Sequence, residues 1–263
     1  MKFSDMMALH ERAPDSLIGR GPRYPWGGLY GGQIVAQSLR AAAATVTPEY
    51  RVHSLHAYFI RRGDAEEPIR FEVDRLRNGR SFVTRAVVAR QSMGAILHMS
   101  ASYQSRDAAR YVQASPFPDA PDPETLEKSS WTSMFDRRWI HEEGGRAQAW
   151  LRIPEAPADD PVLAACALAY LSDDLATDAV RSQQQCADGV TGRQWNGISL
   201  DHAIWFHHPL VGNDWQLHDF RCEGLGTPRG LAVGQVFSRQ GHHLATVAQE
   251  VLLRPAPAEG QGT

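Results

Sequence analysis

The chain repeats itself, and this repetition restricts its possible folds more than any other sequence feature. The aligned segments are His53–Gly63 with Ile198–Pro209, and Ser81–Gln91 with Gly230–Gln240. In the first pair His56 falls on His202, and both segments of the second pair end in Arg-Gln. The identities are few, but the aligned elements follow one another in the same order. We therefore expect a duplicated structural unit.

Each half predicts one helix followed by four strands. The first helix is expected from Gly32 to about Val46 after a glycine-rich start, and the second over 161–175 with Pro161 in its first turn. Period-two alternation predicts strands at 51–60, 68–76, 81–91 and 95–104, and at 198–207, 215–222, 230–239 and 243–253. Asn78-Gly79 predicts a tight turn. A helix wrapped by a curved antiparallel sheet, twice, is an α+β architecture whose two units pair at a sheet edge.

The chain divides into four stretches. An N-terminal unit is expected over 1–104, and a C-terminal unit over 144–254. Between them, 105–143 is expected to be an extended linker because four prolines lie close together in SPFPDAPDPE. Residues 255–263 are expected to form a disordered tail.

Composition excludes several classes of protein. The 263 residues are 43% hydrophobic, which is enough for a core without disulfides. The formal net charge of -3, without a basic run, argues against nucleic-acid binding. No apolar stretch reaches the roughly 18 residues of a membrane span, and the N-terminus lacks a signal-peptide pattern. Three widely spaced cysteines favour reduced thiols and a cytoplasmic location.

No cofactor or metal is expected. The pairs His207-His208 and His242-His243 give no consistent metal geometry, and there is no H-E-x-x-H motif. The glycines before the first helix do not form a nucleotide-binding fingerprint. There is also no G-x-S-x-G elbow, which argues against an α/β-hydrolase.

Several motifs, in order, resemble those of the acyl-CoA thioesterase II family, whose members have two tandem hot-dog repeats. They are Gly31-Gly32-Gln33, Val52–Phe59 (VHSLHAYF), Asn78–Phe82 (NGRSF), Tyr170–Asp173 (YLSD), Ser199–His202 (SLDH), Trp205–His207 (WFH), Arg229-Gly230 and Gln249-Glu250. The likeness covers about Gly21 to Arg254. It implies a double hot-dog fold, with an antiparallel sheet wrapped around a helix in each repeat, and assembly into a homo-oligomer.

The resemblance also implies a catalytic set. In the family an Asp, a Thr or Ser, and a Gln hold and activate the hydrolytic water, and these positions are Asp173, Ser199 and Gln249 here. Ser replaces the commoner Thr, which keeps the hydroxyl and removes a methyl group. Thioester hydrolysis by direct water attack needs these functional groups and no covalent intermediate.

The residues alone support these roles only in part. Gln249 falls on an apolar face of its predicted strand and needs a partner there. Ser199 is expected on the face opposite Ile198, and Asp173 near a helix C-terminus, where a carboxylate opposes the helix dipole. Each also fits a purely structural role: a Gln satisfied by backbone, a structural hydroxyl and a solvated helix end. The same alternation predicts that His202 is structural.

Five further residues are candidates for substrate binding. Gly32 and Gln33 begin a helix whose free N–H groups suit a carbonyl or a phosphate. His56 is a candidate lining residue, and Arg80 and Arg229 are candidates for holding CoA phosphates. The predicted partner is therefore acyl-CoA, hydrolysed to free acid and CoA. Two alternatives stay open: a non-hydrolytic acyl-CoA-binding protein and a hot-dog enoyl-CoA hydratase. The sequence does not predict the acyl chain length.

Overall fold

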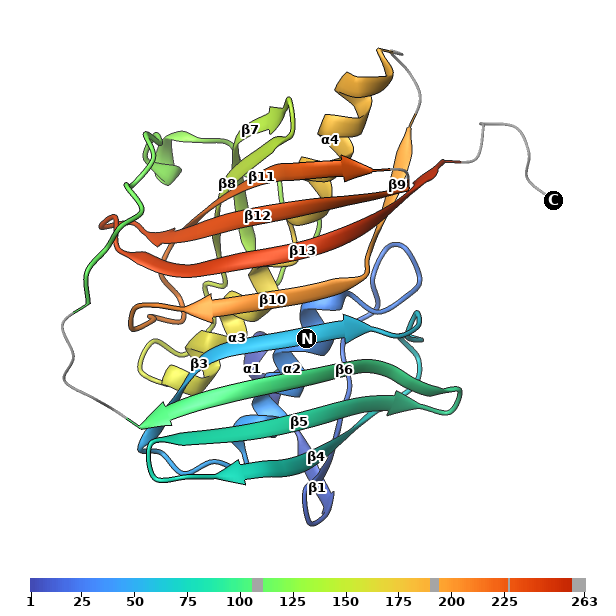
Figure 1. Cartoon of the computed structure of the whole chain (residues 1–263), viewed down its shortest axis with the longest axis vertical. Helices are drawn as coiled ribbons and strands as arrows, with labels where there is room; N and C mark the ends of the chain where they lie inside the picture. Colours follow the sequence, from blue (N-terminus) through green and yellow to red (C-terminus); the bar gives the residue numbers. More distant parts are fainter. Residues whose placement is uncertain (106–110, 190–193, 227, 257–263) are drawn as a thin grey trace.

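A computed structural model describes residues 1–105, 111–189, 194–226 and 228–256. Their strands form one antiparallel sheet of 13 strands that curves around two central helices (Figure 1). The first half contributes β1 (His10–Ala13), β2 (Ser16–Gly19), β3 (Tyr50–Phe59), β4 (Ile69–Asn78), β5 (Phe82–Gln91) and β6 (Gly94–Ser105). The second half contributes β7 (Asp136–Glu143), β8 (Arg146–Arg152), β9 (Trp195–Ser199), β10 (Asp201–Phe206), β11 (Gln216–Gly226), β12 (Arg229–Ser238) and β13 (His243–Pro255).

The strand order shows the duplication directly. Outward from the centre, β3-β6-β5-β4 in the first half corresponds to β10-β13-β12-β11 in the second. The two halves join where β3 and β10 pair antiparallel, with Leu55 opposite Ile204. An approximate two-fold axis through this junction therefore relates the halves.

The two central helices lie on the concave side of the sheet (Figure 1). The two central ones are α2 (Gly31–Ala43) and α3 (Pro161–Leu171), and the others are α1 (Phe3–Met7), η1 (Pro123–Thr125) and α4 (Ala176–Asp188). Asp160 caps α3 by accepting from the N–H groups of Val162 and Leu163, and Pro161 takes the first helical position. Helices α2 and α3 pack against each other and run antiparallel, because the N-terminus of α2 meets the C-terminus of α3.

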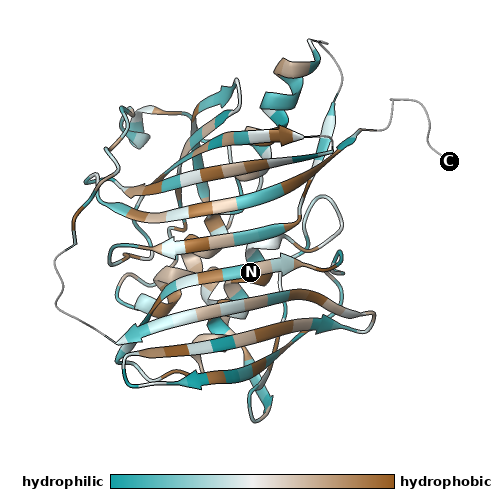
Figure 2. Cartoon of the chain, viewed as in Figure 1, coloured by the Kyte–Doolittle hydropathy of each residue, from teal (hydrophilic) through white to brown (hydrophobic). Residues whose placement is uncertain are grey.

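The core lies between the helix pair and the sheet. Hydropathy alternates along the strands (Figure 2), and the inward residues of β13 are buried. Helix α3 is buried from Ala164 to Leu171, as its alanine-rich sequence predicts for a helix packed on both sides. The predicted turn at Asn78-Gly79 is confirmed, since Gly79 N–H donates to the Phe82 carbonyl.

Several sequence expectations need correction. Residues 136–143, assigned to the linker, form β7 and pair with β8. The second helix ends at Leu171 rather than 175, and a further helix, α4, follows it. The strand expected over 198–207 is interrupted at Leu200, so that β9 and β10 are separate strands.

The rest of the linker lies along the outer face of the second half. Phe117 contacts the rings of Trp150 and Phe237, and Trp150 Nε1 donates to the Pro121 carbonyl. The proline-rich segment therefore covers apolar side chains that the sheet leaves on that face. Of the tail expected over 255–263, Pro255 ends β13, and residues 257–263 lie outside the described part of the chain.

Candidate active site

Asp173 lies between the ends of the two central helices. It follows Ser172, the C-cap of α3, and its Oδ2 accepts a 2.8 Å hydrogen bond from the N–H of Gly32 in the first turn of α2. The C-terminal end of α3 disfavours a carboxylate here, whereas the N-terminal end of α2 favours one. Glycine is required at position 32, because a Cβ atom would lie 2.3 Å from the carbonyl oxygen of Tyr170.

The interruption at Leu200 turns Ser199 toward Asp173. An unbroken strand would place Ser199 opposite the inward side chains, but here its Oγ donates to Asp173 Oδ1 at 3.1 Å. Ile198, expected on the apolar face, is instead 53% exposed. Gln249 lies on the buried face of β13, as its alternation predicts, and its Nε2 donates to Ser199 Oγ at 2.8 Å. The three residues thus form a continuous carboxylate–hydroxyl–amide contact.

His202 extends this contact on the other side of Gln249. It is fully buried on β10, with Nδ1 2.5 Å from Gln249 Oε1 and Nε2 2.8 Å from Ser172 Oγ. Strand alternation predicted a structural role for His202 and did not reveal its contact with the Gln249 amide. The sequence signal that could have indicated this contact is a histidine on the buried face of a strand, close in sequence to Ser199.

Burial dominates the electrostatics of the site. It raises the pKa of Asp173 to about 7, although hydrogen bonds from Ser199 and Gly32 act in the opposite direction. Burial also lowers the pKa of His202 to about 4, so this imidazole is neutral near pH 7. A carboxylate that titrates near neutrality is suited to general-base catalysis.

The neighbouring Asp174 has a different environment. Its carboxylate accepts from Trp131 Nε1 at 2.6 Å and from Arg137 Nη1 at 3.0 Å. Burial raises its pKa, and the charge of Arg137 opposes that effect. Asp174 therefore fixes the segment after α3, and Asp173 faces Ser199.

The structure brings only some of the candidate substrate-binding residues to this site. Gly32 contacts Asp173, and Gln33 is buried one residue further along α2, where it bonds to Tyr24 and Gln37. His56 is exposed on the opposite face of the sheet. It pairs across the strand junction with Ala203, while His202 pairs with Ala57. The two histidines aligned in the repeat thus point to opposite faces.

The candidate arginines are also separate from Asp173. Arg80 lies in the exposed turn between β4 and β5, where its carbonyl accepts from the hydroxyl of Tyr50. Arg229 is exposed on β12 and forms an ion pair with Glu250 at 2.8 Å. Neither side chain contacts the carboxylate–hydroxyl–amide set in the described structure.

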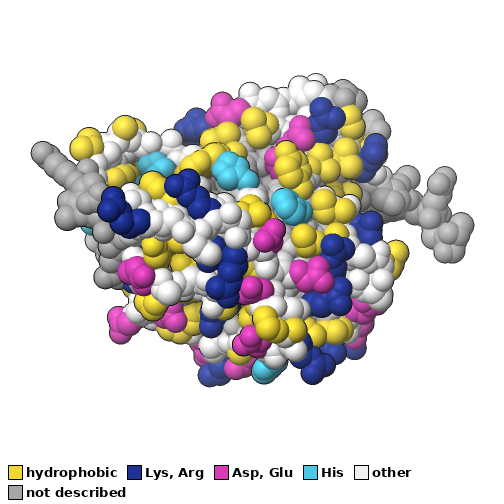
Figure 3. Space-filling view, turned by 60° about the horizontal axis from the view of Figure 1, so that its bottom comes forward, with side chains coloured by type: hydrophobic (Ala, Val, Ile, Leu, Met, Phe, Trp, Pro, Cys, Tyr) yellow, Lys and Arg dark blue, Asp and Glu magenta, His cyan; other side chains and the backbone are white. Residues whose placement is uncertain are grey.

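Other site types find no support among the described residues. In that part of the chain no group of three His, Cys, Asp or Glu side chains is arranged to hold a metal ion. None of the described helices is long and apolar enough to cross a membrane. On the face shown in Figure 3, lysine and arginine lie among acidic residues rather than in one basic patch.

Comparisons with known proteins identify the family. Residues 21–104 match the model of the acyl-CoA thioesterase N-terminal domain, and residues 123–252 match that of acyl-CoA thioesterase. The chain belongs to the acyl-CoA thioesterase II family. It is 33% identical to acyl-CoA thioesterase 2 of Haemophilus influenzae, over 91% of this chain and 93% of that protein.

Solved structures agree with this assignment. An acyl-CoA thioesterase II from Mycobacterium marinum has 34% identity and a TM-score of 0.84, covering 99% of both chains. A hot-dog protein of unknown function from Alicyclobacillus acidocaldarius, at 21% identity, has a TM-score of 0.83 over 97% of this chain and 98% of its own. The fold of this thioesterase family member is therefore the double hot-dog, and the expected α+β class is confirmed.

Proposed function

We propose that the protein hydrolyses acyl-CoA thioesters to a free acid and CoA by direct attack of water. Asp173 takes the proton of the water, and Ser199 and Gln249 orient it. The observation that carries this proposal is the contact of these three side chains beside the N-terminus of α2.

The reaction balances with the groups present. Water attacks the thioester carbonyl as its proton moves to Asp173, and the carbonyl oxygen becomes an oxyanion. The Gly32 N–H already donates to Asp173. The other main-chain N–H groups at the start of α2 have no partner within the helix and supply stabilisation for that oxyanion. The carbon–sulfur bond then breaks, and the proton on Asp173 passes to the departing CoA sulfur.

The test is acyl-CoA hydrolysis, followed by release of free thiol over a range of chain lengths. Asp173→Asn should lower kcat at least 100-fold with the fold intact, because a positioned general base contributes about 10²–10⁴-fold. Asp201→Asn is the matched control: it lies close in sequence to Ser199, and the amide keeps the oxygen that accepts from the Glu250 N–H. Equal turnover by Asp173→Asn and wild type, or binding of acyl-CoA without turnover in wild type, would contradict the proposal.

Assembly into a homo-oligomer and a cytoplasmic location stay predictions. Light scattering of the purified protein measures the first, and cell fractionation the second.

A further inference from the structure

The segment that follows β3 runs beside the Asp173 site. A Cβ atom at Gly31 would lie 2.6 Å from Asp173 Oδ2 and 3.0 Å from Phe59 Cζ, so the carboxylate and the phenyl ring border the same point. Phe59 ends β3, and Arg61 and Arg62 come directly after it. Consecutive Cα atoms are about 3.8 Å apart, so the Cα atoms of both arginines lie within about 12 Å of that of Phe59.

The guanidinium of Arg62 is held across the glycine-rich loop before α2. A Cβ atom at Gly28 would lie 2.4 Å from Arg62 Nε, so only glycine leaves room for this side chain. Arg62 Nη2 donates to the Trp26 carbonyl. The Leu29 N–H donates to the Gly63 carbonyl at 3.1 Å, which fixes the loop to the same segment. Arg62 is nevertheless exposed, and its guanidinium has further N–H donors that the bond to Trp26 does not use.

The charges of these two arginines are not neutralised by a carboxylate. Arg61 is also exposed, and its Nη1 donates to the Met93 carbonyl. Among the described residues, no ion pair joins Arg61 or Arg62 to an acidic side chain. Glu66, close by in the sequence, is instead paired with Arg23 at 2.7 Å. Two positive charges therefore remain for an anionic ligand.

Trp26 adds an aromatic surface beside them. Its ring stacks on that of Tyr24, with 5.2 Å between centroids and 8° between planes, and it packs edgewise against Trp131 and Tyr30. These contacts fix the ring, yet Trp26 remains 45% exposed. Nucleobases stack on aromatic rings, and arginine forks match the geometry of phosphates. An exposed ring next to two arginines therefore suits a ligand that carries both a base and phosphates.

We propose that Trp26, Arg61 and Arg62 bind the nucleotide end of CoA. The adenine stacks on Trp26, and the phosphates meet the two guanidinium groups. The pantetheine arm then runs from the arginines past Phe59 to the thioester beside Asp173. The choice of CoA rests on the proposed function, since acyl-CoA is its substrate.

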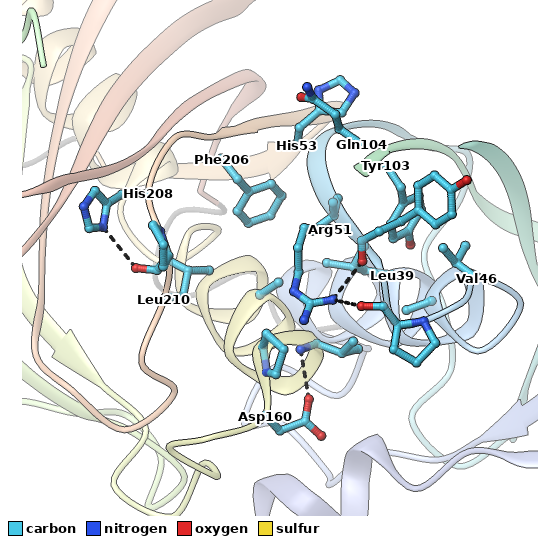
Figure 4. A pocket seen from close by; sticks show the side chains of 18 of the residues that line it. Leu39, Val46, Arg51, His53, Tyr103, Gln104, Asp160, Phe206, His208 and Leu210 are labelled. Carbon is cyan, nitrogen blue, oxygen red and sulfur yellow. Dashed lines mark hydrogen bonds between the residues drawn. The ribbon is translucent and has the colours of Figure 1, made fainter. Parts of the chain in front are cut away.

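A large cavity elsewhere in the protein has no part in this site. It has a volume of about 1240 Å³, and its walls include Leu39, Phe206 and Leu210 (Figure 4). None of its described lining residues belongs to the segments 24–32 or 59–64, which carry the ring and the arginines.

Calorimetry with free CoA tests the site on the intact protein without any need for turnover. Arg62→Ala should weaken CoA binding at least tenfold, and Trp26→Leu several-fold. Arg221→Ala is the matched control, because it removes an exposed arginine from β11 in the other half of the chain, and it should bind CoA as wild type does. Thermal unfolding of each variant checks that the fold is intact.

Kinetics with a truncated substrate test the same residues during hydrolysis. S-acyl pantetheine carries the thioester but lacks the nucleotide. Arg62→Ala should raise KM for acyl-CoA at least tenfold, with little change in kcat, and should leave kcat/KM for S-acyl pantetheine unchanged. Equal losses with both substrates would overturn the proposal, because the effect would then lie at the reacting thioester.

The outcomes separate this proposal from the proposed function. CoA that binds wild type, Arg62→Ala and Trp26→Leu equally overturns the nucleotide site, even where Asp173→Asn abolishes hydrolysis. Protein that does not hydrolyse acyl-CoA, yet loses CoA binding in Arg62→Ala and not in Arg221→Ala, rejects the hydrolysis mechanism and supports the nucleotide site.

Discussion

A directed chain of hydrogen bonds ends at the carboxylate of Asp173. His202 is neutral, and Gln249 Oε1 is only an acceptor, so the imidazole proton lies on Nδ1. The Gln249 amide then donates to Ser199, and the Ser199 hydroxyl donates to Asp173. Each hydrogen bond in this chain thus has a fixed donor and a fixed acceptor. The side-chain amide of Gln249 can therefore adopt only one of its two flipped orientations.

Replacing His202 should disturb this orientation without touching the substrate. We expect His202→Leu to lower kcat about 10–100-fold, because it leaves Gln249 Oε1 buried without a donor, at a cost of about 1–3 kcal/mol. His202→Asn, whose side-chain amide can replace the Nδ1 donor, should recover most of the rate. KM for acyl-CoA should change little in either variant. Equal loss in both variants, or a loss confined to KM, would contradict this positioning role.

Substitutions of Ser199 test the link between amide and carboxylate. Ser199→Thr keeps the hydroxyl and should retain activity within a few-fold. Ser199→Ala removes a donor to Asp173 and an acceptor for Gln249, so kcat should fall about tenfold or more. Steady-state kinetics of the two variants measure this, and similar rates for Ala and Thr would show that the hydroxyl has no role.

The raised pKa of Asp173 predicts two pH dependences. The base must be ionised, so kcat/KM should rise with pH and level off above an apparent pKa of about 7. A profile that stays flat between pH 5 and pH 8 would contradict the assignment of Asp173 as the base.

The raised pKa of Asp173 has the opposite effect on stability: the folded protein should become less stable as pH rises, while its activity increases. Between about pH 4 and pH 7 the folded protein keeps the Asp173 proton while the unfolded chain has lost it, so the free energy of unfolding falls as pH rises through this window. The decrease is on the order of 4 kcal/mol for a shift of about three pKa units. Denaturant unfolding of wild type and Asp173→Asn at pH 5 and pH 8 isolates this contribution. An unchanged difference between the two proteins would contradict it.

At the scale of elements, the site depends on where α3 ends and where the strand at Leu200 breaks. Apolar spacing predicted both central helices and most strands, because their patterns come from burial on one face. No such apolar pattern marks the end of α3 at Leu171 or the break between β9 and β10 at Leu200. The break places Ser199 on the face opposite to the one expected from an unbroken strand. The resemblance named the three catalytic candidates, whereas the contact with His202 depends on strand pairing that one sequence does not show.

The close approach of α2 and α3 can be tested at Gly32. Gly32→Ala should lower Tm by several degrees and reduce activity, because the methyl group meets the Tyr170 carbonyl and pushes the Gly32 N–H away from Asp173. Gly224→Ala is the control, since a Cβ there has nothing within 4 Å. Thermal unfolding and turnover of both variants measure the effect. A Gly32→Ala protein as stable and active as Gly224→Ala would contradict the argument.

At the scale of the whole molecule, the duplication builds the proposed hydrolytic site from both halves. The first half supplies the N-terminus of α2, and the second supplies Asp173, Ser199 and Gln249. The repeat predicted this division. The sequence alignment set His56 beside His202, whereas in the structure these two histidines lie on opposite faces of the sheet. An alignment with so few identities does not fix which residues of the two repeats correspond. An error of one residue in that alignment exchanges the two faces of a strand.

The central claim is that water attacks the thioester directly, with Asp173 as base rather than nucleophile. Single-turnover hydrolysis of an acyl-CoA in ¹⁸O-labelled water, with enzyme in excess, tests this most directly. Mass spectrometry then measures the label in the released acid and in the peptide that contains Asp173. We predict one ¹⁸O atom in the acid and none in the peptide. Label in the Asp173 carboxylate would reveal a covalent anhydride and contradict the account.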